Sequence, residues 1–126
     1  MLPAAHRMLR SEDFGAAVRS GARSGTRRLV IHYRAGEAGQ DAPALVGVVV
    51  PKKQVARATH RNRIKRRVRA LMRERVGRLS PGTMLVVRGL AGADGAASPE
   101  LARDLDRCLE RVQALAGGRS SHEHRG

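Results

Sequence analysis

The chain has 126 residues, 41% of them hydrophobic, and carries 25 lysines and arginines against 11 acids, a formal net charge of +14. This length suits one domain with one core, and the longest apolar run, residues 45–50, is far shorter than the roughly 20 residues of a membrane-spanning helix. One Phe, one Tyr and no Trp argue against recognition by a platform of stacked aromatics. So positive a surface predicts a polyanionic partner.

The first part of the chain predicts one helix and then three strands. Ser11-Glu12-Asp13 supplies a capping hydroxyl and early acids, so we expect a helix over residues 12–19 that ends near Gly21. Residues 22–26, 29–34 and 45–50 favour strands, the last two because they are rich in β-branched residues. Residues 35–44 form a Gly- and Ala-rich loop.

A long basic helix is predicted next. Pro51 ends the third strand because it has no amide for further pairing, and the helix begins between residues 56 and 60 and runs to about residue 76. Its buried face is a stripe at helical spacing: Ile64, Val68, Leu71 and Met72. At 100° per residue, a contiguous polar arc beside this stripe holds Asn62, Lys65, Arg66, Arg69 and Arg73, with Arg63 and Arg67 on the opposite flank.

The remaining chain predicts a strand and a helix. Residues 83–88 favour a strand, and Ser98-Pro99-Glu100 has the order of cap, first-turn proline and acid that begins a helix. Its buried face would hold Leu101, Leu105, Cys108, Leu109, Val112 and Leu115. We expect Gly117-Gly118 to end it, so that residues 1–116 form a single domain and residues 117–126 a disordered tail. The order α-β-β-β-α-β-α predicts an α+β sandwich, a sheet with helices packed on it.

Charge is concentrated in residues 52–78, which hold twelve of the twenty-five cations and one acid, Glu74. Like charges at helical spacing repel each other, so this density is costly to fold unless a polyanion neutralises it. An ordinary solvated helix face mixes both signs, and this one does not. The sequence therefore predicts a nucleic acid as the partner.

The other chemical groups predict no catalytic residue and no metal site in the protein. No two acids lie in a strand-and-turn setting that would hold two metal ions, and neither His32 nor His60 belongs to a cluster with metal-ligand spacing. The lone Cys108 is expected to be a buried structural thiol. Asp104 and Asp106 on the last helix are expected to pair along that helix with Arg103, Arg107 or Arg111.

One combination of motifs resembles a known family. Pro51-Lys52-Lys53 ends a strand, and Arg61-Asn62-Arg63-Ile64-Lys65-Arg66 opens the basic helix. This combination resembles the signature of the bacterial ribonuclease P protein subunit, and the likeness extends over about residues 7–115. It implies a four-stranded mixed sheet and a left-handed βαβ crossover through the basic helix.

The resemblance also implies a function. The protein would be the non-catalytic subunit of a ribonucleoprotein hydrolase, an endonuclease whose RNA and RNA-bound Mg²⁺ remove the 5′ leader of precursor tRNA. Its implied partners are the ribonuclease P RNA and precursor tRNA, with no membrane and no DNA expected. Residues 1–10 lack the apolar stretch of a secretory signal, so we expect a cytoplasmic protein.

Two sets of site residues follow from this resemblance. Contacts to the RNA subunit are expected from Lys52, Lys53, Arg57, Arg61, Asn62, Arg63, Lys65, Arg66 and Arg69. A cleft for the single-stranded leader, formed by the first helix and the sheet, is expected to include Phe14, Val18, Tyr33 and Val48. Val18 and Val48 stand where many relatives have aromatics, so we expect leader binding here to rest more on charge.

Several simpler interpretations remain open at this point. Phe14 and Tyr33 could be ordinary core residues, since aromatics usually serve burial. A basic ribosomal protein would share both the charge and the fold. A DNA-binding module would also be basic, but its recognition helix normally follows a helix-turn-helix rather than a strand.

Overall fold

The structure is a computed structural model that describes residues 2, 4–8, 15, 17–19, 21–36 and 41–125, with side chains in the last helix described as far as residue 115. In chain order its elements are η1 (Ala4–His6), β1 (Ala22–Gly25), β2 (Leu29–Arg34), β3 (Leu45–Val49), α2 (Ala58–Arg73), η2 (Val76–Arg78), β4 (Met84–Gly89), η3 (Ala91–Ala93) and α3 (Ser98–Arg125). Residues 15 and 17–19 are helical. The rest of the predicted first helix lies outside the described residues.

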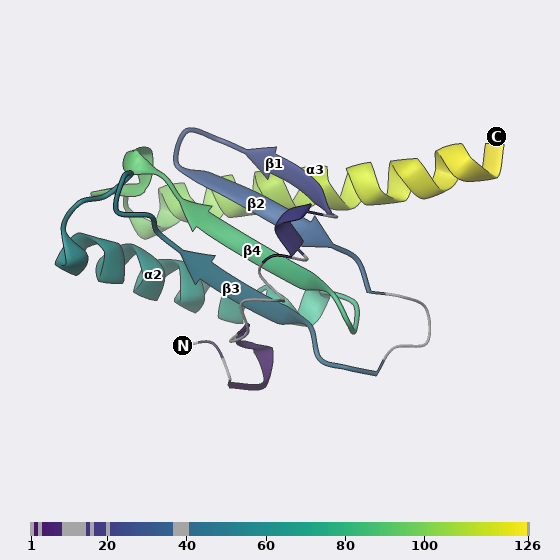
Figure 1. Ribbon diagram of the computed structural model, residues 1–126, viewed down its shortest axis with the longest axis horizontal. Helices are drawn as coiled ribbons and strands as arrows, with labels where there is room; N and C mark the ends of the chain where they lie inside the picture. Colours follow the sequence, from purple (N-terminus) through teal and green to yellow (C-terminus); the bar gives the residue numbers. More distant parts are fainter. Residues whose placement is uncertain are drawn as a thin grey trace.

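The four strands form one mixed sheet in the order β1-β2-β4-β3 (Figure 1). β1 and β4 both pair with β2 in antiparallel fashion, whereas β3 and β4 are parallel. Parallel strands need a crossover, and α2 supplies it between β3 and β4. The predicted four-stranded mixed sheet with helices packed on it is confirmed.

Both long helices cover the same face of the sheet (Figure 1). Alternate residues of β2 point toward them, and Leu29 and Ile31 are fully buried there. On α2 the buried residues are Ile64, Val68 and Met72, which confirms most of the predicted stripe, and Leu71 packs at its edge. The predicted buried thiol of Cys108 also lies in this core.

The described residues cover the opposite face of the sheet only in part. Met8, Ala17 and Val86 form a second, smaller apolar cluster, where the helical residues 17–19 cross the sheet. Gly21 allows the chain to pass from these residues into β1, because a Cβ there would overlap the carbonyl oxygen of Tyr33. Beside this cluster the described residues leave part of the face open.

α3 differs from its prediction in two respects. It continues to Arg125, so Gly117-Gly118 does not end it, and residues 117–125 of the predicted disordered tail are helical. Glycine lowers helix propensity by about 1 kcal/mol, yet it keeps the N–H that the helical hydrogen bond needs, so it does not oblige a helix to stop.

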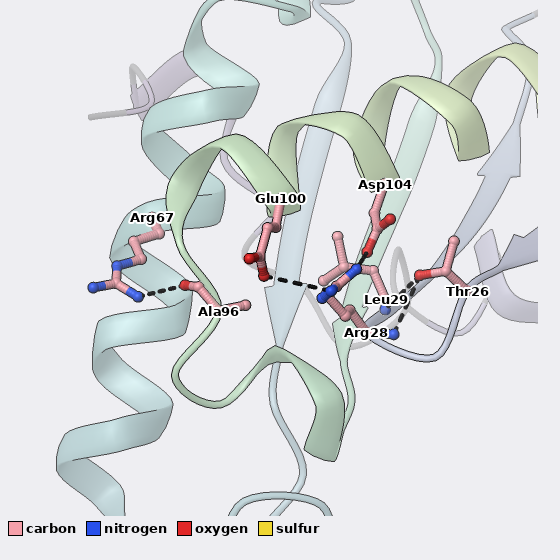
Figure 2. Close-up of polar contacts among 7 residues, drawn as sticks. All are labelled: Thr26, Arg28, Leu29, Arg67, Ala96, Glu100 and Asp104. Carbon is pink, nitrogen blue, oxygen red and sulfur yellow. Dashed lines mark hydrogen bonds and ion pairs between the residues drawn. The ribbon is translucent and has the colours of Figure 1, made fainter.

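The predicted ion pairs along α3 were also wrong. Asp104 pairs instead with Arg28, which reaches it from the turn before β2 at 3.2 Å and lies 3.4 Å from Glu100 (Figure 2). Asp106 pairs with Arg75, just beyond α2. Both aspartates therefore attach α3 to neighbouring elements, a role that the sequence of α3 alone does not reveal.

Candidate nucleic-acid interface

The exposed side of α2 gathers most of the predicted RNA-contacting residues. Because Ile64, Val68 and Met72 anchor the helix to the sheet, the polar side chains turn outward. They line a shallow depression, the cationic helix surface, made by Thr59, Asn62, Arg63, Lys65, Arg66 and Arg69. Five of the nine predicted contact residues thus share one surface, and each is exposed or half-buried.

A second depression continues this surface toward α3. It is lined by Arg63, Arg66, Arg67, Ala70 and Ser98. Here Arg67 donates a hydrogen bond from Nη1 to the carbonyl oxygen of Ala96 at 2.6 Å (Figure 2). Arg67 therefore also holds the segment before α3 against α2.

The other predicted contact residues lie in the segment before α2 and in the first turn of that helix. Lys52, Lys53 and Arg57 are exposed there. Arg61 is half-buried, and its Nη1 donates to the carbonyl oxygens of Val55 at 3.0 Å and Ala56 at 2.6 Å. Arg61 thus positions the turn carrying the two lysines, a structural task in addition to its predicted RNA contact.

Arg75 does not belong to the cationic surface, although it was counted among the twelve cations. Its side chain is buried and forms a two-point ion pair with Asp106, Nε to Oδ1 at 2.7 Å and Nη2 to Oδ2 at 3.1 Å. The hydrogen bond from Arg75 lowers the pKa of Asp106. Glu74 is therefore not the only acid that opposes these cations, since α3 brings a second one.

A groove of about 860 Å³ opens on the other face of the sheet. Its apolar floor includes Val30, Val49 and Val86, and Arg23 and Arg88 contribute guanidinium groups. The full lining is Gly15, Val18, Arg23, Val30, His32, Val49, Pro51, Gln54, Val86, Arg88 and Leu90. It therefore combines an apolar surface with cations and no carboxylate among its described lining residues.

The residues predicted to line the leader cleft lie in different places in the structure. Val18 lines the groove and is 48% exposed, and Phe14 lies outside the described residues. Tyr33 and Val48, each 7% exposed, belong to the core on the helix-covered face. Their placement in the cleft is corrected, because side chains alternate along a strand and their neighbours His32 and Val49 are the ones that face the groove.

Sequence reasoning missed Arg23, His32 and Arg88 as groove residues. For His32 the sequence contained a signal, because side chains alternate along β2. His32 therefore lies on the same face of the sheet as Val30 and on the opposite face from Tyr33. His32 is 8% exposed. Burial lowers its pKa, and the nearby positive charges of Arg23 and Arg88 lower it further, so the imidazole is neutral at neutral pH.

The described residues form neither a cluster of metal ligands nor a membrane-spanning helix. The described part of the chain contains no group of three or more His, Cys, Asp or Glu side chains that could hold a metal ion. The Mg²⁺ that the family resemblance implies is expected on the RNA, and these residues offer it no such group of ligands. Within the same residues, no helix has the length and apolar character needed to cross a membrane.

The mixed sheet, the cationic helix surface and the open groove define a basic α+β protein of the nucleic-acid-binding class. The family model described as Ribonuclease P matches residues 2–113. The chain is 46% identical over 123 residues to the ribonuclease P protein component of Streptomyces avermitilis, covering 94% of this chain and 98% of that protein. It is 48% identical over 118 residues to that of a Nocardioides species, covering 94% and 100%.

Solved structures match the fold. The RNase P protein of Staphylococcus aureus superposes with a TM-score of 0.71 at 22% identity, over 84% of this chain and 94% of that one. The protein from Thermotoga maritima gives a TM-score of 0.66 at 24% identity, over the same shares of 84% and 94%. These two likenesses concern the fold.

The chain therefore belongs to the ribonuclease P protein family. It is a subunit of the RNase P ribonucleoprotein, an endoribonuclease of tRNA processing. The RNA of RNase P is accordingly its partner. The family resemblance predicted from the strand-end lysines and the basic helix is confirmed.

Proposed function

We propose that this subunit binds the catalytic RNA through the cationic helix surface and the turn before α2, and that it holds the 5′ leader of precursor tRNA in the groove. Through these contacts it stabilises the holoenzyme and lowers the Mg²⁺ concentration needed to remove the leader. Mg²⁺ is bound mainly by the RNA in this proposal, and the protein supplies no catalytic residue.

The cationic helix surface suits RNA phosphates. Arg63, Arg66 and Arg69 lie together on it, and a guanidinium group binds a phosphate through two parallel hydrogen bonds while keeping its charge. Asn62, on the same surface, can both donate and accept, as a contact to a 2′-hydroxyl requires. The surface therefore has the donors for backbone recognition without reading a base sequence.

The observation that carries the leader proposal is the composition of the groove. A single strand has exposed base faces for the floor of Val30, Val49 and Val86, and phosphates for Arg23 and Arg88. A duplex stacks its bases inward and would leave that floor without an apolar partner. The groove also reaches Pro51 and Gln54, beside Lys52 and Lys53, so one RNA assembly could contact both surfaces.

The test is cleavage of a 5′-extended tRNA by a bacterial ribonuclease P RNA at limiting Mg²⁺. Three reactions are compared: the RNA with this chain, the RNA alone, and the chain alone. We expect cleavage only when RNA and chain are both present, since the chain adds binding energy and the RNA performs the chemistry. Tight RNA binding without rescue would contradict the proposed function and favour a ribosomal type of RNA-binding protein.

A further inference from the structure

His32 lies on the groove floor between two arginines from neighbouring strands. In the sheet register it stands opposite Arg23 of β1 and Val86 of β4. Arg88 follows two residues after Val86 and so lies on the same face of the sheet. All three polar residues line the groove, which places an imidazole where a bound phosphate would meet both guanidinium groups.

Among the described residues, the charged groups around His32 are cations. Arg23 comes from β1 and Arg88 from β4, and Arg34 lies further along β2 on the same face. Near the groove wall, the Arg19 guanidinium lies close to Gly15, since a Cβ at Gly15 would be 3.2 Å from Nη2. β3 and the turn before α2 contribute the uncharged Val49, Pro51 and Gln54.

We propose that the occupation of this groove by a single-stranded RNA phosphate is coupled to the protonation of His32, so that the leader binds more tightly as the pH falls. The inference rests on the proposed function, because it takes the leader as the occupant of the groove. In the free protein a protonated His32 would be a buried cation among other cations. A phosphodiester supplies an anion, which the described groove residues do not, and makes the protonated form favourable.

The direction of the effect follows from linkage. In the free protein the pKa of His32 is lowered by burial and then by Arg23 and Arg88, and a bound phosphate raises it. RNA binding therefore takes up a proton, and the affinity rises as the pH falls from the bound pKa to the free pKa. Each unit of difference between these pKa values corresponds to about a tenfold change in affinity.

The experiment measures the leader advantage of the holoenzyme, defined as the dissociation constant for mature tRNA divided by that for an uncleavable precursor. The ratio removes pH effects that the two RNAs share. From about pH 8 to about pH 5.5 we expect it to rise about three- to tenfold with the natural chain. His32→Gln should abolish this rise, whereas His60→Gln, a histidine outside the groove that contacts Asp94, should keep it.

Each outcome has a separate meaning. A leader advantage that exists but does not change with pH in the natural chain would overturn the coupling to His32. An equal rise in the His32→Gln variant would overturn the assignment to this residue. The absence of any leader advantage at every pH would instead contradict the proposed leader binding.

A second measurement uses only the natural chain, so it does not depend on whether a variant folds. The pKa of His32 is measured by NMR, from the chemical shift of a carbon-bound imidazole proton as the pH is changed. The full chain is used alone and saturated with a short single-stranded oligoribonucleotide. The inference requires a higher pKa in the bound chain by about half a unit or more, which is an affinity change of about threefold. An unchanged or lower pKa would overturn it.

Discussion

Arg75 shows at the scale of one residue how an arginine in a basic segment can serve the fold. Its side chain is buried, makes the two-point ion pair with Asp106 and donates to the carbonyl oxygen of Leu71 at 2.8 Å. The two bonds to Asp106 connect the segment just after α2 to α3, and the bond to Leu71 holds Arg75 against the last turn of α2. The Arg75 side chain is therefore buried within the fold and is not part of the cationic helix surface.

Asp106→Asn should lower the free energy of unfolding by about 1 to 2 kcal/mol near neutral pH, because the buried guanidinium loses its charged partner. The value stays below that of a fully buried pair because the Asp106 side chain is 45% exposed. The folded pKa of Asp106 is lowered by Arg75, so its contribution is present above the unfolded value of about 3.9 and is lost as the pH falls through the folded pKa. Urea unfolding from about pH 7 to about pH 3 measures the loss of stability and its dependence on pH.

Glu110→Gln is the matched control, because it removes an exposed carboxylate from the same helix. We expect it to change the free energy of unfolding by less than about 0.5 kcal/mol. Equal losses for the two variants would show that the ion pair with Arg75 adds nothing beyond general charge balance.

At the scale of an element, α2 separates its two tasks by face. One narrow stripe packs on the sheet, and the cationic helix surface, which we propose binds RNA phosphates, lies outside that stripe. Replacing Arg66 and Arg69 together with Ala should flatten the dependence of the logarithm of RNA affinity on the logarithm of salt concentration by about 1.4 to 1.8, if each arginine makes one phosphate contact. Binding of ribonuclease P RNA across a salt series measures this slope.

The control variant is Arg103→Ala with Arg107→Ala, two exposed arginines of α3. It removes the same total charge, so it changes the long-range field without touching the cationic helix surface. We expect a slope close to that of the natural chain. If both double variants flatten the slope equally, general charge rather than the α2 surface governs binding.

At the scale of the whole molecule, we propose that residues 1–116 form one RNA-binding domain. Within the described side chains the buried residues of α3 end at Val112, and Leu115 is already 46% exposed. Removing residues 117–126 should therefore change the free energy of unfolding by less than about 0.5 kcal/mol and leave one cooperative transition. Denaturant unfolding of the shortened chain measures this, and cleavage rescue should be retained.

A longer truncation serves as the control. Ending the chain after residue 107 removes the buried Cys108, Leu109 and Val112, so the sheet loses part of its cover and we expect the chain not to fold. A large loss of stability on removing residues 117–126 alone would contradict the proposed boundary.

Local chemistry by itself determined the elements of this protein. β-branched runs predicted β2 and β3, Ser98-Pro99-Glu100 predicted the start of α3, and the spacing of Ile64, Val68 and Met72 predicted the buried stripe of α2. These patterns reflect interactions within a few residues, which the order of the chain contains directly. The basic motif predicted more than local structure, since it indicated the family, and the family resemblance implied the mixed sheet.

The tertiary structure alone decided which groups meet across elements. The alternation in β2 shows that Tyr33 and His32 face opposite ways, but only the packing of α2 and α3 shows which face is covered. The partners of Asp104 and Asp106 likewise come from elements far away in the chain. The physical reason is that periodicity sorts side chains into faces, whereas burial and charge pairing depend on what the rest of the chain places against each face.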